Sequence, residues 1–241
     1  MSYAKVTPQS ISEGAGARIR RLFPGPERDN LDPFVLFDEF EIPPGTGFPE
    51  HPHRGFEVIT YVLQGAMHHR DDQGNDSVVG AGGLQHFSAG SGIVHSEMPA
   101  GDGTTRGIQL WLNLPRSDKG MAPAYASVEA AEIPETKLDG YRVRTVAGPG
   151  SPLAAHTPLL YLDIELAPGG EHAAWVPPGF TGVLYVLRGE LVSDSTPAQA
   201  GEAMLIGEGD VRVTTGPGAR YVVIAGKPLG EPIRQHGPYV D

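Results

Sequence analysis

The stretch His51–Gly65, HPHRGFEVITYVLQG, holds both a candidate metal motif and one copy of a repeated strand. Its last five residues, Tyr61–Gly65 (YVLQG), return 124 positions later as Tyr185–Gly189 (YVLRG). Each copy follows a Gly-Phe dipeptide at a strand entry and is followed by a glycine-rich segment. A repeat of this length, in matching surroundings, predicts two tandem units of similar fold.

Short apolar runs of strand length recur along the whole chain. They are Phe34–Phe40, Phe56–Leu63, Gly107–Leu114, Tyr141–Val146, Leu159–Leu166, Gly182–Leu187, Ala203–Ile206, Val211–Thr215 and Arg220–Ala225. The 33 glycines and 23 prolines are scattered between these runs, where tight turns need them. The fold class predicted is all-β.

One segment, Pro123–Ala131 (PAYASVEAA), has helical character, and it is short for an isolated helix. Together with the repeat, this predicts two tandem antiparallel β-barrels with few short helices. We expect an N-terminal barrel over residues 1–120, a polar connector over 121–140 and a C-terminal barrel over 141–241.

The composition excludes several function classes. Acidic residues outnumber basic ones 29 to 18, and the longest basic cluster is Arg18, Arg20 and Arg21, so a nucleic-acid partner is not expected. No stretch approaches the about 20 apolar residues of a membrane span, and no signal peptide is evident. We therefore expect a soluble cytoplasmic protein with no membrane partner. Because the chain has no cysteine, a metal would need His, Asp, Glu or Tyr ligands.

Two pairs of residues have the spacing of metal ligands. His51 and His53 are separated by Pro52, which favours extended backbone, so both imidazoles can face one point. His95 and Glu97, in GSGIVHSEMP, repeat this spacing about 40 residues later. Together they predict a three-histidine, one-carboxylate site, which suits first-row divalent ions and leaves coordination positions open.

Other histidines carry no such pattern. We interpret His156, His172 and His236 as hydrogen-bonded surface or core residues. His68 and His69 adjoin the polar run Arg70–Asp72, which favours a solvated turn.

The motifs also carry a family resemblance. The two spacings are similar to the metal motifs of the cupin superfamily, and GFPEHPHRGFE, GIVHSEMP, GIQLWLNLP and PLGEPIRQHGPYV closely resemble the pirin family of bicupins, from about Asp32 to residue 241. The resemblance implies a metal held by His51, His53, His95 and Glu97. It would be Fe(II), with Mn, Ni, Co, Cu or Zn as alternatives.

Two positions depart from the cupin pattern. The pattern places a further glutamate at Val58, whereas the acid here is Glu57, and a one-residue shift in a strand moves a side chain to the other face. In the second unit, positions equivalent to the ligands hold Trp175, Pro177, Thr214 and Gly216. We therefore expect no metal in the C-terminal barrel.

The resemblance implies quercetin 2,3-dioxygenase activity, with a small aromatic substrate and O₂. A flavonol's 3-hydroxyl and 4-carbonyl could occupy open metal positions, and Glu97 could take the hydroxyl proton as general base. Phe48, Met98 and Pro99 flank the ligands and are expected to contact substrate, whereas Phe56 is interpreted as core. Arg54 could hold a substrate oxygen or form an ion pair with Glu57, and a structural or supporting role is the favoured interpretation.

The alternative function comes from the same resemblance. Some pirin-like proteins are described as regulators that bind a protein partner and respond to the oxidation state of the metal. The acidic net charge of −11 suits partners with basic patches. We expect a monomer, because two fused barrels can cover each other's exposed faces.

Overall fold

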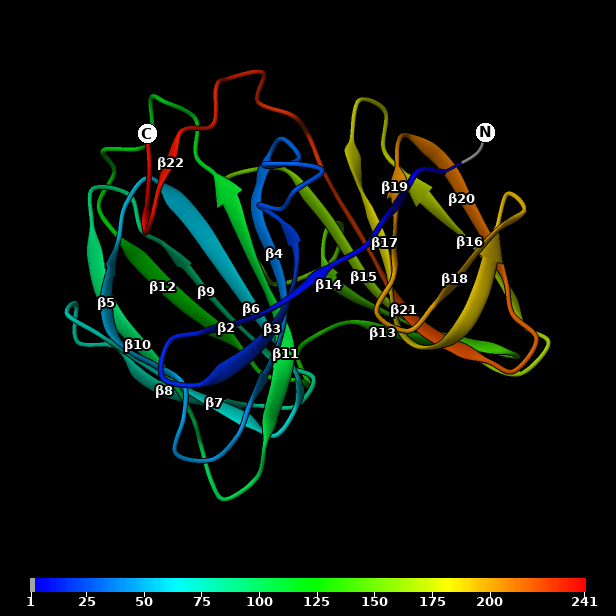
Figure 1. Cartoon of the computed structure of the whole chain (residues 1–241), viewed down its shortest axis with the longest axis horizontal. Coiled ribbons are helices and arrows are strands. Elements are labelled where there is room, and N and C mark those ends of the chain that lie inside the picture. Colours follow the sequence, from blue (N-terminus) through cyan, green and yellow to red (C-terminus); the bar gives the residue numbers. More distant parts are fainter. Residues whose placement is uncertain (1–2) are drawn as a thin grey trace. The chain divides into compact units, whose positions relative to one another are not determined.

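The computed structural model describes residues 3–241, and these form strands, turns and loops without a helix (Figure 1). The helix expected over Pro123–Ala131 is wrong, because this segment contains strand β12 (Ala124–Val128). β12 pairs along its whole length with β9 (Leu84–Ser88). A strand edge satisfies the backbone groups of a segment too short to hold a helix by itself. None of the described residues forms an apolar helix long enough to cross a membrane.

The chain divides into two compact units. The first, here called the N-terminal barrel, comprises Gln9–Glu132 and Leu229–Asp241. The second, the C-terminal barrel, comprises Ile133–Pro228 and the residues up to Pro8. The boundaries expected at residues 120 and 140 stay a prediction.

Antiparallel sheets build the N-terminal barrel. Its strands are β2 (Gln9–Glu13), β3 (Ala17–Phe23), β4 (Phe34–Ile42), β5 (Phe48–His53), β6 (Phe56–Gln64), β7 (Ala66–Asp71), β8 (Asp76–Gly80), β9, β10 (Ile93–Pro99), β11 (Thr105–Asn113), β12, β22 (Gln235–His236) and β23 (Tyr239–Val240). The larger sheet has the order β12-β9-β6-β11-β4-β3-β2, the smaller one the order β5-β10-β7-β8, and β22 pairs with β23.

Alternation along the strands separates two apolar clusters in this barrel. Phe56 and Val58 of β6 pack with Trp111 of β11 in one cluster, and Val62 of β6 joins Phe40 of β4 in another. Polar residues interrupt the first face at the register pair Thr60↔Gln109. Thr60 and Gln109 therefore form a polar spot on an otherwise apolar inner face.

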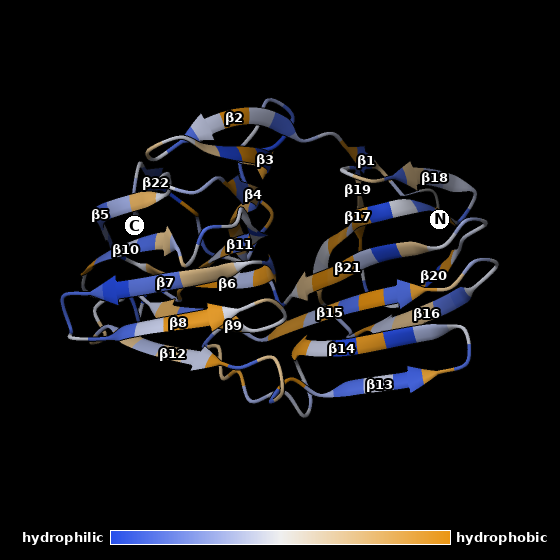
Figure 2. Ribbon diagram, turned by 90° about the horizontal axis from the view of Figure 1, so that it is seen from below, coloured by the Kyte–Doolittle hydropathy of each residue, from blue (hydrophilic) through white to orange (hydrophobic). Residues whose placement is uncertain are grey.

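The C-terminal barrel has a single branched sheet. Its strands are β1 (Lys5–Val6), β13 (Glu135–Leu138), β14 (Tyr141–Ala147), β15 (Leu159–Leu166), β16 (Glu171–Val176), β17 (Thr181–Ser193), β18 (Thr196–Gln199), β19 (Ala203–Ile206), β20 (Gly209–Thr214) and β21 (Ala219–Gly226). The main path is β1-β19-β17-β21-β15-β14-β13, and β16 pairs with β20. Figure 2 shows hydrophilic and hydrophobic positions alternating along β14.

Side chains fill the C-terminal barrel. Its core consists of buried Leu, Ile, Val, Ala, Met and Tyr residues, among them Leu184, Val223 and Tyr221. Trp175, which the sequence repeat aligns with the candidate ligand His51, is 59% exposed.

The sequence repeat corresponds to a repeated bend in the backbone. Gly65 joins β6 to β7 with a φ of 75°, and Gly189 lies inside the long strand β17 with a φ of 76°. Both angles lie in the left-handed region that glycine adopts without steric cost. The two YVLxG segments therefore end in the same bend.

A glycine in β11 gives a test of packing in the N-terminal barrel. A Cβ at Gly107 would lie 2.4 Å from the Phe40 ring and 2.4 Å from the Tyr61 carbonyl oxygen, whereas a Cβ at Gly80 of β8 would meet nothing within 4 Å. We expect Gly107→Ala to lower the free energy of unfolding by about 1–3 kcal/mol, because the packed strands must move apart. Gly80→Ala is the matched control and should be neutral or slightly stabilising. Urea midpoints that are equal for the two variants would contradict this packing.

Candidate metal centre

Three histidines meet where two strands of the smaller sheet pair. β10 runs antiparallel to β5, and the register places His95 opposite His51. His53 lies two residues further along β5, on the same face as His51. One ligand atom from each ring lies within 4.8 Å of those of the other two. Two local i, i+2 patterns and one strand pairing thus assemble three nitrogen ligands.

The hydrogen bonds of these rings select which nitrogen faces the common point. His51 Nδ1 donates to the Pro49 carbonyl oxygen (2.7 Å), and His53 Nδ1 donates to the Pro238 carbonyl oxygen (3.2 Å). A carbonyl oxygen can only accept, so both rings carry their proton on Nδ1 and keep a lone pair on Nε2. His95 Nε2 is buried without a hydrogen-bond partner. Buried nitrogens with free lone pairs fit a bound metal ion.

Burial keeps two of the rings neutral. Desolvation, followed by the neighbouring His51, lowers the pKa of His53 to about 3. Desolvation, followed by His53, His51 and His69, holds the pKa of His95 well below its usual value. The neutral imidazole is the form that binds a metal, so these rings need not lose a proton first.

Glu97 lines a cavity together with His51 and His53. Its carboxylate does not belong to the group of histidine ligand atoms that lie within 4.8 Å of one another. It is 1% exposed, and two donors hold its carboxylate: Thr60 Oγ1 on Oε1 (2.7 Å) and Gln109 Nε2 on Oε2 (2.7 Å). Trp111 Nε1 donates to Gln109 Oε1 (3.1 Å). The indole N–H can only donate, so it must face the amide oxygen of Gln109. The amide nitrogen of Gln109 is thereby directed to Glu97.

The cavity that His51, His53 and Glu97 line has a volume of 490 Å³. Phe48, Leu36 and Trp111 give it apolar walls, and Arg21 and Asp38 add a paired polar wall. The volume lies within the range of about 300–1,000 Å³ that is usual for small-molecule sites. Its size and lining suit a flat, partly polar ligand.

The four expected substrate contacts are placed differently. Phe48 lines the cavity, whereas Met98, Pro99 and Arg54 are absent from the described residues that line it. Arg54 pairs with Asp241 (Nη2 to Oδ1, 3.0 Å) and lies over the Tyr239 ring, with 5.2 Å between its Cζ and the ring centroid. In this structure Arg54 anchors the segment that contains β22 and β23, through Tyr239 and Asp241.

That segment, Leu229–Asp241, is here called the strap, and it belongs to the N-terminal barrel. Gln235, Gly237 and Pro238 line the cavity, and Pro238 accepts the hydrogen bond from His53. The buried Val240 packs in the same core as Phe56 and Trp111. The strap therefore forms one wall of the cavity and orients one of its histidines.

Hydrogen bonds hold the strap at two further points. Val240 N donates to the Arg54 carbonyl oxygen (2.9 Å), and Lys119 Nζ donates to the Val240 carbonyl oxygen (3.1 Å). Lys119 also donates to Gly55 O and to Asn113 Oδ1.

The structure corrects the interpretation of His68 and His69. Both lie in β7, and His69 is fully buried, with its ring stacked on Tyr125 at 4.2 Å. His68 is partly exposed and pairs with Asp76. The solvated turn predicted for His69 is wrong, because adjacent residues of a strand face opposite sides and one side here is the barrel interior.

Sequence reasoning also missed Thr60, Gln109 and Trp111, the residues that orient Glu97. A signal was present, since a single polar residue, Thr60 or Gln109, interrupts an apolar strand in VITYV and in GIQLW. Glu57 forms a separate pair, in which it accepts hydrogen bonds from His86 Nε2 (2.9 Å) and Ser88 Oγ (3.2 Å).

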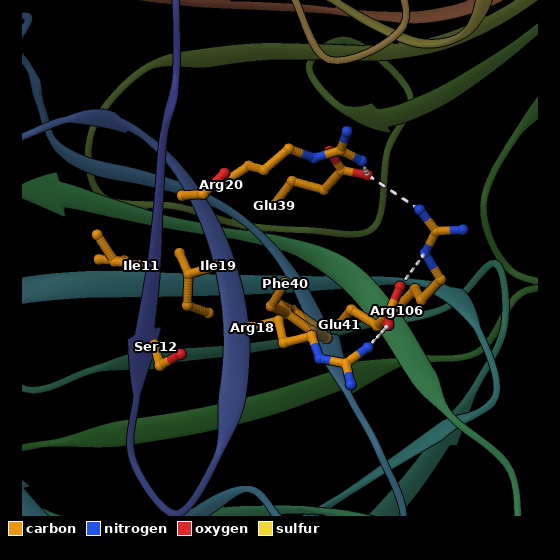
Figure 3. A pocket seen from close by; sticks show the side chains of 10 residues that line it. Ile11, Ser12, Arg18, Ile19, Arg20, Glu39, Phe40, Glu41 and Arg106 are labelled. Carbon is orange, nitrogen blue, oxygen red and sulfur yellow. Dashed lines mark hydrogen bonds and ion pairs between the residues drawn. The ribbon is translucent and has the colours of Figure 1, made fainter.

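A second hollow of 670 Å³ lies over β2, β3, β4 and β11 (Figure 3). Arg18 pairs with Glu41 (2.9 Å), and Arg20 pairs with Glu39 (2.8 Å). Arg106 approaches both carboxylates, at 3.5 Å from Glu39 and 3.8 Å from Glu41. The charges here compensate one another, so the histidine cavity is the stronger candidate site.

Known proteins are similar to this chain in both sequence and fold. The Pirin family model matches residues 16–112, and the model of the Pirin C-terminal cupin domain matches residues 161–241. The chain is 43% identical to Pirin from Homo sapiens over 247 residues, which cover 98% of this chain and 85% of the human protein. It is also 43% identical to a Pirin-like protein from Solanum lycopersicum over 246 residues, which cover 98% of this chain and 84% of that protein.

A solved structure extends the similarity to a named enzyme. The crystal structure of quercetin 2,3-dioxygenase from Acinetobacter baumannii superposes with a TM-score of 0.88 at 30% sequence identity, covering 98% of this chain and 90% of that one. The cupin architecture expected for both barrels is thereby confirmed.

The strap makes a direct prediction about metal binding. A Cβ at Gly55 would lie 1.9 Å from the Val240 carbonyl oxygen, so Gly55→Ala must displace the strap and with it the acceptor of His53. Loss of such an outer partner weakens metal binding by roughly tenfold or more. We expect this loss in calorimetric titrations with Co(II).

Gly74→Ala is the matched control. Gly74 has a φ of 91° against 86° for Gly55, but its Cβ would meet nothing within 4 Å. The two variants thus carry the same backbone strain. Equal Co(II) affinities for both would show that the strap has no part in the site.

Proposed function

Because the chain belongs to the pirin family, we propose that its N-terminal barrel binds a divalent metal and opens flavonols such as quercetin with O₂. The observation that carries this proposal is the convergence of ligand atoms of His51, His53 and His95 to within 4.8 Å of one another, together with the buried His95 Nε2 that has no hydrogen-bond partner. The 30% identical enzyme of the same fold supports the reaction class.

We assign the histidines and Glu97 as the metal ligands. Three imidazoles and one carboxylate suit Fe(II), and Mn, Ni, Co, Cu and Zn are alternatives with this ligand set. When bound, the metal supplies open positions for the substrate oxygens and lowers the pKa of the 3-hydroxyl. Thr60 and Gln109 hold the Glu97 carboxylate beside the histidine group.

Glu97 is also the proposed general base. Its carboxylate accepts one hydrogen bond on each oxygen, and each oxygen keeps a lone pair that can accept the proton of a flavonol 3-hydroxyl. The side chain is nearly excluded from solvent, so a proton passes to it from the substrate rather than from bulk water.

The cavity walls orient the substrate. Phe48 and Trp111 present rings to a planar ligand, and Trp111 stacks in turn on Phe56 at 4.3 Å. Arg21 makes a bidentate pair with Asp38 (2.8 and 2.6 Å) and also pairs with Glu13 (2.8 Å), and Glu50 lines the cavity as well, so carboxylates outnumber cations on this side. A neutral flavonol suits such a cavity better than an anionic substrate.

Metal reconstitution tests the reaction. The purified protein is stripped of metal, loaded separately with Fe(II), Mn(II), Ni(II), Co(II) or Cu(II), and assayed for loss of quercetin absorbance together with O₂ uptake. We expect turnover with at least one metal, and loss of both bound metal and turnover in His95→Ala. His68→Ala is the control. His68 lies on the face of β7 opposite to the buried His69 and pairs with Asp76, so this variant should keep both bound metal and turnover.

Turnover that survives in His95→Ala would overturn the metal mechanism. Absence of turnover with every metal, although metal binds, would instead favour the alternative function, a regulator that binds a protein partner.

Glu97→Gln separates two roles of the carboxylate. The amide keeps the shape and can still accept hydrogen bonds, but it is a poor base and a weak ligand. We expect metal content to fall together with turnover if Glu97 is a ligand. If Glu97 acts only as a base, metal content stays at the wild-type level and turnover falls by about 10²–10⁴-fold. Unchanged turnover would remove Glu97 from the mechanism.

A further inference from the structure

A fourth histidine, His69, lies directly behind the candidate ligand His95. It belongs to β7, which pairs with β10 on the side away from β5. The Nδ1 atoms of His69 and His95 are 3.5 Å apart. On its other side, His69 Nε2 is 3.0 Å from Asp71 Oδ2, and the side chains of His69 and Asp71 are both fully buried.

The chemistry of these partners fixes the direction of each hydrogen bond. A carboxylate only accepts, so His69 Nε2 carries a proton and donates it to Asp71. In the tautomer with its proton on Nε2, the His69 ring offers a lone pair at Nδ1, to which His95 Nδ1–H can donate. His95 Nε2 is left with a lone pair, and this is the buried atom that lacks a partner.

Packing and a turn hold this chain of groups in place. Tyr125 stacks on the His69 ring, with the centroids 4.2 Å apart and 17° between the planes. Asp71 is fixed by Asn75, which donates from Nδ2 to Oδ2 (2.8 Å) and from its backbone N to Oδ1 (2.9 Å). The β7–β8 turn therefore sets the position of the carboxylate that orients His69.

We propose that Asp71 and His69 are positioning residues that hold His95 in its Nδ1–H tautomer, so that Nε2 is presented to the divalent metal. This inference rests on the metal site proposed above. His69 corresponds in this role to Pro49 for His51 and to Pro238 for His53, since each occupies the Nδ1 atom of one ligand ring. Partners that hold ligand histidines in this way raise metal affinity.

A purely structural role explains the burial of His69 less well. An apolar ring would fill the same volume and stack on Tyr125 without taking a carboxylate and an imidazole out of water. The substitution His69→Phe would keep the ring and lose both hydrogen bonds, so it separates filling of the volume from hydrogen bonding.

Four variants carry the test. His69→Phe keeps a ring against Tyr125 but removes the acceptor for His95. His69→Gln restores an amide that can accept from His95 and donate to Asp71. Asp71→Asn keeps the side-chain shape at the turn but removes the charge. His68→Phe is the matched control, because it changes the adjacent residue on the opposite face of the same strand.

Two readouts are used, neither of which depends on turnover. Co(II) affinity is measured by titration, with the thermal midpoint of the metal-free protein as a check on folding. Imidazole ¹⁵N chemical shifts of the metal-free protein report the tautomer of His95. We expect His69→Phe to weaken Co(II) binding by about 10–100-fold and to let His95 populate the Nε2–H tautomer.

The remaining variants sharpen the result. His69→Gln should recover most of the affinity, Asp71→Asn should lose part of it, and His68→Phe should match the wild type. Wild-type affinity together with the Nδ1–H tautomer in His69→Phe would overturn the inference while leaving the metal site intact. A wild-type protein that binds no metal would overturn the metal site itself, and the inference with it.

Discussion

The antiparallel pairing of β5 with β10 is the constraint on which the site depends. His51 and His53 come from one strand and His95 from the other, and the register that puts His95 opposite His51 brings their nitrogens together. A slip of one residue would turn every side chain of β10 to the other face. The register shifts between His95 and Glu97, where β5 uses one residue more than β10 before Phe48 pairs with Glu97. Even so, both His95 and Glu97 stay buried.

The spacing of the candidate ligands could be recognised in the sequence, whereas most of the residues that surround and orient them could not. The i, i+2 spacing of His51 and His53, and of His95 and Glu97, depends only on strand geometry, so it could be recognised without the fold. The groups that orient these side chains come from strand order instead. Gln109 reaches Glu97 from the larger sheet, and Pro238 reaches His53 across 185 positions of sequence.

The two incorrect local predictions have related causes. The segment around β12 was interpreted as helix because its short alanine-rich pattern lacked a visible partner, and β9 provides that partner. His69 was interpreted as solvated because polar residues follow it, although the strand turns this one side chain inward. In both places the contact that decides the structure is made by a strand distant in sequence, which local patterns do not contain.

The strap has a consequence for the order in which the protein matures. Residues 229–241 are translated after the whole C-terminal barrel, yet they supply a wall of the cavity in the N-terminal barrel and the acceptor for His53. While the ribosome is still making the second barrel, the first one therefore has all three histidines but neither a closed cavity nor a fixed His53 ring. Acquisition of the proposed metal in its final geometry must then be a late step, which follows synthesis of β22 and β23 and is separate from folding of the barrel that contains the three histidines.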